Sequence, residues 1–270
     1  MRDRYVVNSK FIIIRQIATL VGIFAAFGVN VWANTNPPNG LTIGEISQQI
    51  FRDVLITPAG YAFAIWGLIY LGLFSLGIYQ VLPAQRNNPL MRKIGYKLAI
   101  ASIAQIIWVI CFLYRQYTAS FLAMLCILLP LIGAYWSLPF KPSRFRRITK
   151  WQKWLIRTPI SIYLAWISVA TILNGAIVLE SWQWSGWGIS AVWWTAIMLL
   201  VAGFIAHFVA IPRLDYAYAG VFIWASIAIA VKNSDTLLIS GIAIGLSIAL
   251  SLLLISFSFY DRDEPSIGRN

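Results

Sequence analysis

Residues 57–82 read TPAGYAFAIWGLIYLGLFSLGIYQVL and contain no charged side chain. An uninterrupted apolar run of this length crosses the hydrocarbon core of a bilayer, which needs about 20 helical residues. The chain holds eight such runs, at roughly 12–33, 60–82, 98–114, 119–139, 158–179, 189–211, 216–231 and 237–259. The runs lack the alternation of polar and apolar residues that outer-membrane barrels show. We therefore predict an all-α, polytopic membrane helical bundle with about eight transmembrane helices.

The overall composition supports the same class. Of the 270 residues, 60% are hydrophobic and only 11% are charged, and the mean hydropathy is +0.74. A soluble globular domain is about 45–50% apolar and about 25% charged. The lipid bilayer is therefore the first partner that the sequence predicts.

The net charge of +12 is distributed along the chain in a way that predicts orientation. If the N-terminus is cytoplasmic, 18 of the 21 basic residues fall on the cytoplasmic side, and the three outside are Arg52, Arg115 and Lys232. Cytoplasmic segments of membrane proteins carry this excess of Lys and Arg. We expect both termini in the cytoplasm, in an inner membrane or its equivalent. The basic segment 141–157 is then a loop facing anionic lipid, and we expect no nucleic-acid partner.

The N-terminal run also has features of a signal peptide, with a basic start and the tripeptide VWA ending at Ala33. Its apolar stretch is long for a signal peptide, whose apolar region spans 7–15 residues. We expect the first helix to be retained in the protein.

The long connection 34–59 carries the signals of a short amphipathic helix. Thr42 and Glu45 have the spacing of a capping box. Apolar residues follow at intervals of three or four, at Ile43, Ile46, Ile50 and Val54. We predict a helix over about 43–55. Either it covers the outer end of the bundle as a lid, or it anchors the chain at the membrane interface.

Two features of the C-terminal third indicate membrane positioning and helix packing. The stretch ESWQWSGWGISAVWW, residues 180–194, holds five tryptophans, as interfacial belts do. Gly241 and Gly245 form a GxxxG pattern, which allows close helix contact. The partner helix lies either in the same chain or in a second copy, so a homodimer is one of two alternatives.

Catalytic chemistry has little support in the sequence. The apolar runs hold almost no ionisable side chains, and no set of acid, base, nucleophile or metal ligands is recognisable. The two cysteines have no CxxC spacing. We expect a protein that is not an enzyme, with no catalytic residue, no metal site and no required cofactor.

Aromatic and amide side chains instead suggest a binding site. Phe63, Trp66, Tyr70 and Phe74 share one helical face, as do Tyr163, Trp166, Ala170 and Asn174. At a rise of 1.5 Å per residue, Trp66 and Trp108 lie roughly 9–10 Å below the outer surface, as Asn174 does at about 9 Å. By the same measure, Tyr70, Gln105 and Ala170 lie at about 15 Å. An apolar cavity with a few placed polar groups is what a small-molecule site requires.

At these residues the chain resembles the translocator protein family, also called tryptophan-rich sensory proteins or peripheral benzodiazepine receptors. The matching positions are Pro58, Phe63, Trp66 and Tyr70, then Trp108 and Phe112, and, in YLAWISVATILN, Tyr163, Leu164, Trp166, Ala170, Leu173 and Asn174. The chain departs from the family pattern at Tyr61, where the family commonly has Trp, at Gln105 in place of Asn, and at Ile162 in place of Pro.

The resemblance covers about the first 180 residues. It implies a five-helix ligand-binding core over 1–180 and three additional transmembrane helices over 181–270. It further implies that the protein binds a flat hydrophobic ligand, such as a porphyrin, another tetrapyrrole or a sterol-like lipid. Transport or sensing of that ligand is what the resemblance adds to binding.

The expected ligand-binding residues are Tyr61, Phe63, Trp66, Tyr70, Gln105, Trp108, Tyr163, Trp166, Ala170 and Asn174. Aromatic faces would stack on the ligand, and Gln105 and Asn174 would orient it through hydrogen bonds. Two other functions remain open at this stage. One is secondary transport of a small neutral solute, and the other is a structural or assembly role in a membrane complex.

Overall fold

The part of the chain that the computed structural model describes is residues 9–139 and 149–263. Every regular element in these residues is a helix or a helical turn, so the all-α prediction is confirmed. The residues divide into two compact units. The first unit takes Met1–Ile43 and Ala64–Ile167, and the second takes Gly44–Phe63 and Ser168–Asn270.

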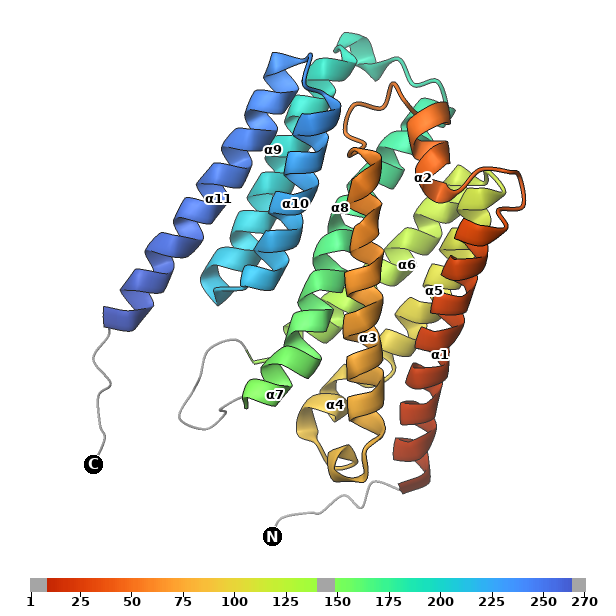
Figure 1. The fold of residues 1–270 in the computed structure, drawn as a ribbon, viewed down its shortest axis with the longest axis vertical. Coiled ribbons are helices and arrows are strands. Elements are labelled where there is room, and N and C mark those ends of the chain that lie inside the picture. Colours follow the sequence, from red (N-terminus) through yellow and green to blue (C-terminus); the bar gives the residue numbers. More distant parts are fainter. Residues whose placement is uncertain (1–8, 140–148, 264–270) are drawn as a thin grey trace. The chain divides into compact units, whose positions relative to one another are not determined.

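Each of the eight apolar runs forms one long helix (Figure 1). In lipid the backbone has no water to bond, so an apolar chain satisfies its N–H and C=O groups within a helix. The helices are α1 (Ser9–Thr35), α3 (Ile65–Val81), α5 (Lys97–Leu113), α6 (Tyr117–Trp136), α8 (Thr158–Ser181), α9 (Ala191–Ala210), α10 (Tyr216–Lys232) and α11 (Leu237–Asp263).

Length and composition make six of these helices candidate membrane spans. The other two, α5 and α10, are equally apolar but have 17 residues each. That length is at the lower limit, about 17 residues, of what crosses a bilayer core. The chain is a polytopic integral membrane protein.

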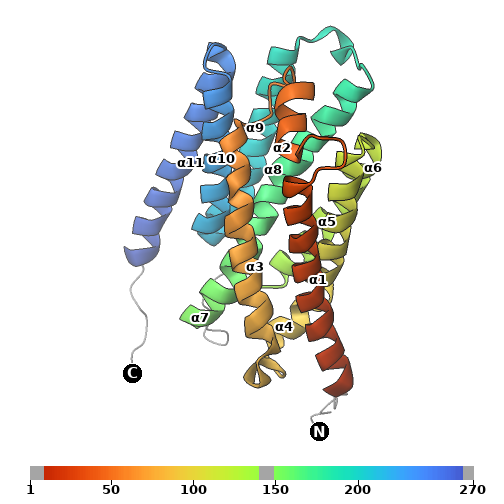
Figure 2. The same ribbon diagram turned by 45° about the vertical axis from the view of Figure 1, so that its right-hand side comes forward.

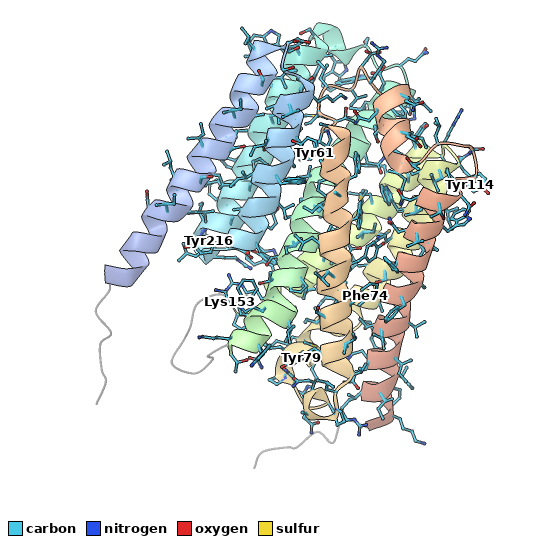
Figure 3. The ribbon with its side chains drawn as sticks, viewed as in Figure 1. Tyr61, Phe74, Tyr79, Tyr114, Lys153 and Tyr216 are labelled. Carbon is cyan, nitrogen blue, oxygen red and sulfur yellow. The ribbon has the colours of Figure 1, made fainter. Side chains whose placement is uncertain are left out.

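The first unit consists of α1, α3, α5 and α6, together with α8 up to Ile167. Helix α5 contacts both α1 and α6, and α1 also contacts α3 (Figures 1 and 2). Helices α3 and α8 approach closely at Gly72, where an added Cβ would lie 3.1 Å from the Cβ of Pro159. Near the middle of α3, Phe74 stacks on Phe24 of α1 with 4.8 Å between ring centroids (Figure 3). Short helical segments connect α3 to α5, namely η3 (Pro83–Gln85) and α4 (Pro89–Ile94).

The second unit consists of α9, α10 and α11, which contact one another, together with α8 from Ser168 onward. Tyr218 on α10 donates a 3.3 Å hydrogen bond to the hydroxyl of Ser168 on α8. Two short turns, η5 (Gly186–Gly188) and η6 (Ile211–Arg213), precede and follow α9.

The connection after α1 is helical over a shorter range than predicted. It forms α2 (Ile43–Glu45) and a π-helical turn, η1 (Ile46–Ile50), which closes with a 3.2 Å bond from Phe51 N to Ile46 O. The prediction of a helix continuing to residue 55 is therefore wrong. Ile43 and Ile46 are buried as expected, but Ile50 is exposed, because the π turn rotates the chain away from the regular helical face.

Hydrogen bonds join the segment 44–63 to α10. Ala59 N donates to Ala228 O over 3.0 Å, and the Asn233 side chain donates to Leu55 O over 2.8 Å. The indole of Trp224 donates to Ala62 O over 3.1 Å. The segment that sequence reasoning assigned to the five-helix core thus packs within the second unit, and its role as a lid or an interfacial anchor stays a prediction.

Several expectations concern residues outside the described ranges. These include both chain ends and residues 141–148 of the basic segment 141–157. From Thr149 the chain forms α7 (Lys150–Gln152) and the π-helical turn η4 (Lys153–Arg157). The cytoplasmic location of the termini stays a prediction. The division into a ligand-binding core and added helices at residue 180 also stays a prediction, since the two units are defined by packing alone.

Candidate functional site

Six of the ten predicted ligand-binding residues belong to the first unit. Ring contacts or hydrogen bonds join five of them, and the sixth, Trp166, lies about one turn from Tyr163 on α8. The six residues come in pairs from three helices, and all six are buried: Trp66 and Tyr70 from α3, Gln105 and Trp108 from α5, and Tyr163 and Trp166 from α8. We call these six residues the central cluster. Each pair is separated by three or four positions, so both members lie on one face of their helix.

The indole of Trp66 is in ring contact with three other aromatic side chains of the cluster. It stacks on Trp108 with 6.2 Å between centroids and 29° between planes. Tyr163 meets it edge-on at 6.2 Å, and Tyr70 lies 5.8 Å away. The contact between Trp66 and Trp108 agrees with the matched depths that their positions along the helices predict.

A directed chain of hydrogen bonds runs beside these rings. The hydroxyl of Tyr163 donates to Gln105 Oε1, and Gln105 Nε2 donates to the hydroxyl of Tyr70 over 2.6 Å. Tyr70 in turn donates to the backbone oxygen of Ala26 on α1 over 3.1 Å. An amide nitrogen carries two protons. One proton of the Gln105 amide is used within this chain, which leaves the other for a further acceptor.

The chemistry available to the central cluster is recognition of an apolar, flat surface. Its members offer ring faces, ring edges and one amide, and none carries a charge at neutral pH. Outside the cluster, no group of three or more His, Cys, Asp or Glu in residues 9–139 and 149–263 is placed to hold a metal ion.

The other four predicted residues belong to the second unit. Tyr61 is 45% exposed and meets Trp224 of α10 edge-on at 5.2 Å (Figure 3). Phe63 is half-buried, and Ala170 and Asn174 are buried one turn apart on α8. Tyr61 therefore packs against α10, whereas sequence reasoning had grouped it with Trp66.

A comparison with models of protein families matches residues 16–256 to the family described as TSPO-like protein. The chain belongs to the TSPO-like family. The match extends past residue 180 through most of α11, so the last three helices are part of what the family model describes. Neither the curated proteins nor the solved structures gave a match to the chain.

Sequence reasoning missed the contribution of α1 to the surroundings of the central cluster. Phe27 meets the ring of Tyr70 edge-on at 5.1 Å, and Ala26 supplies the carbonyl that Tyr70 bonds. The spacing of Phe24 and Phe27 could have indicated an aromatic face on α1, because residues three apart are neighbours on a helix. A backbone carbonyl carries no sequence signal.

Proposed function

We propose that this TSPO-like membrane protein binds a flat, hydrophobic ligand at the central cluster, with porphyrins and other tetrapyrroles as the first class to test and sterol-like lipids as the second. The near-parallel pair Trp66 and Trp108 is the observation that carries the proposal. Two tryptophan faces beside a hydrogen-bonded amide provide both a stacking surface and an orienting group.

The distance between the rings sets how a ligand would enter. Contacting carbon atoms lie about 3.5 Å apart, so a flat ring between two indoles needs about 7 Å between their planes. The centroids of Trp66 and Trp108 are 6.2 Å apart, so the pair must separate for a ligand to stack between them. Trp66 lies at the start of α3, directly after the 3₁₀ turn η2 (Gly60–Ala64). Binding should therefore change the environment of both indoles.

The remaining proton of the Gln105 amide would orient the ligand. A carboxylate or carbonyl on the rim of a tetrapyrrole is a suitable acceptor. Tyr70 and Tyr163 hold the amide in place through their hydrogen bonds, so its direction is fixed before the ligand arrives. We propose that the protein binds this ligand in order to transport or sense it, and that it neither catalyses a reaction nor requires a cofactor.

A titration tests this function directly. The full-length protein, purified in a nonionic detergent, is titrated with protoporphyrin IX while tryptophan fluorescence and the melting temperature are recorded. We expect saturable quenching and a higher melting temperature, since a ligand that binds the folded state stabilises it. Absence of saturable quenching by tetrapyrroles, together with an unchanged melting temperature in the presence of sterols, would favour the two alternatives. Solute uptake in proteoliposomes would then identify a transporter, and copurification with a membrane complex would identify an assembly factor.

A further inference from the structure

The second unit contains a cavity that none of the expected site residues lines. It has a volume of about 300 Å³ and lies among residues 53–55, the last turns of α8, the turn η5 and the first turns of α9. Small-molecule pockets have volumes of about 300–1,000 Å³. The cavity is therefore large enough for a small ligand of a few heavy atoms.

Two tryptophans form one wall of this cavity. Trp184 and Trp194 line it with their ring centroids 5.1 Å apart and their planes at 55°, so they form an open corner. Trp187 meets both rings from outside the lining, at 5.3 and 6.2 Å. The indole nitrogen of Trp194 donates to Gly186 O over 2.8 Å. The N–H of Trp194 is therefore already bonded, and its aromatic ring is what it can present to a ligand.

The turn that carries this corner is held in an unusual backbone conformation. Gly186, Trp187 and Gly188 all have positive φ, at 69°, 52° and 80°. A side-chain-bearing residue such as tryptophan rarely adopts this region, and the surrounding structure must hold it there. An added Cβ on Gly186 would lie 3.3 Å from the ring of Trp194, so glycine lets the ring lie against the turn. The corner is thus formed before any ligand binds.

The charges that line the cavity are negative. Asp53 and Glu180 are both lining residues, and none of the lining residues that the structure describes is basic. Arg52 approaches Asp53 to 3.8 Å, but their side chains are 77% and 87% exposed, and such a surface pair is weak. The amine of Lys232 donates to Val54 O and to the hydroxyl of Thr57 and does not line the cavity, but it lies close enough to Asp53 for the two charges to interact. Glu180 is therefore the carboxylate that the test substitutes.

We infer that this cavity binds an organic cation, an ammonium group that carries apolar substituents. A cation over an indole face is attracted by the ring quadrupole, and two rings at an angle can contact it from two sides. The carboxylates of Asp53 and Glu180 also attract a cation. The side chains of Leu179 and Met198 provide an apolar wall against which its substituents can pack. This site goes beyond the proposed function and does not depend on it, because every residue that lines it belongs to the second unit.

Isothermal titration calorimetry of the full-length protein in maltoside detergent tests the inference by measuring the heat of binding. Benzyltrimethylammonium serves as the cation, and benzenesulfonate serves as an anion of similar shape. We expect saturable binding of the cation that weakens with added salt, and none of the anion. Trp184→Ala should weaken binding of the cation about 2- to 30-fold, the range that one cation–π contact gives. Glu180→Gln should weaken it about 1.5- to 5-fold, as for a partly exposed charge pair.

Matched controls lie close in the chain. Trp193→Ala removes an exposed tryptophan that neighbours Trp194 but does not line the cavity, and Asp235→Asn removes an exposed carboxylate elsewhere in the second unit. Both should leave the affinity unchanged. Glu180 is exposed, so its substitution tests the site even if Trp184→Ala does not fold.

The same ammonium chemistry occurs in a free cation and in a phosphatidylcholine headgroup. Native mass spectrometry with equal amounts of phosphatidylcholine and phosphatidylglycerol separates the two sources. Selective retention of phosphatidylcholine that is lost in Trp184→Ala identifies a lipid, and its absence alongside binding of the free cation identifies a soluble ligand. The inference is overturned if the cation does not bind, if the anion binds equally, or if Trp193→Ala weakens binding as much as Trp184→Ala. The five tryptophans of 180–194 would then act as an interfacial belt alone.

Discussion

The side-chain amide of Gln105 donates a 2.6 Å hydrogen bond to the hydroxyl of Tyr70, and both side chains are buried. The same amide accepts a hydrogen bond from Tyr163, so one side chain on α5 joins α3 to α8. A buried polar group in an apolar bundle stabilises it only while its partners are present. This arrangement gives the central cluster a structural role that is separable from ligand binding.

Tyr163→Phe should lower the free energy of unfolding by about 0.5–2 kcal/mol, because Gln105 Oε1 loses its donor while the packing of the ring is retained. Denaturant or thermal unfolding in detergent measures the change. Tyr114→Phe is the control, since Tyr114 is 54% exposed, and it should change the stability by less than about 0.5 kcal/mol. Equal stability of wild type and Tyr163→Phe would contradict a structural role for the hydrogen-bond chain.

Trp166→Ala and Trp66→Ala should each weaken binding of protoporphyrin IX about 5- to 100-fold, because stacking of a flat ring on an aromatic side chain contributes about 1–3 kcal/mol. Fluorescence quenching in detergent gives the dissociation constants, once circular dichroism has shown unchanged helicity. Two controls are Trp136→Ala in the first unit and Trp182→Ala in the second, since both side chains are largely exposed. If all four variants bind as wild type does, the tryptophan faces serve packing, and the assembly role becomes the leading candidate.

Trp224→Phe should loosen the segment 44–63, because phenylalanine keeps the ring contact with Tyr61 but cannot donate to Ala62 O. Loss of one hydrogen bond of about 1 kcal/mol should speed amide exchange in this segment roughly 3- to 10-fold. Hydrogen–deuterium exchange with mass spectrometry resolves the peptides that cover it. Trp193→Phe provides the comparison, and it should leave the exchange unchanged. A segment that exchanges at the same rate in both variants is held by contacts other than the Trp224 hydrogen bond, such as those that Ala228 and Asn233 make.

Gly245→Leu should reduce self-association of the protein in a bilayer. Gly241 and Gly245 are exposed, and an added Cβ on either would meet no described atom within 4 Å, so this face of α11 has no packing partner in the chain's described residues. Small residues in such a pattern let two helices approach closely, and leucine would hold them apart. Single-molecule photobleaching in vesicles measures the dimer fraction. Gly28→Leu on α1, which likewise has open space around it, is the control. An unchanged dimer fraction would assign this face of α11 to lipid.

The eight long helices were predictable because each depends on local chemistry. In lipid an apolar run must bond its own backbone, so the length and composition of the run set the helix within a few residues. The run 158–179 and the observed Thr158–Ser181 agree for this reason. The end of the helix that begins at Ile43 was not predictable, because the π turn at Ile46–Ile50 depends on what the neighbouring segments allow.

Within the candidate site, helical spacing alone placed Trp66 with Tyr70, and Tyr163 with Trp166, each pair on one face of its helix. Depth along the helices further placed Trp66 and Trp108 at one level, and in the structure their rings are in contact. The packing of Tyr61 against Trp224, and of the segment 44–63 against α10, was decided by tertiary structure. The same holds for the position of Asp53 beside Trp184 and Trp194 in one cavity. A helix is fixed by hydrogen bonds between residues four apart, whereas these contacts join residues more than a hundred positions apart, and only the packing of complete helices selects them.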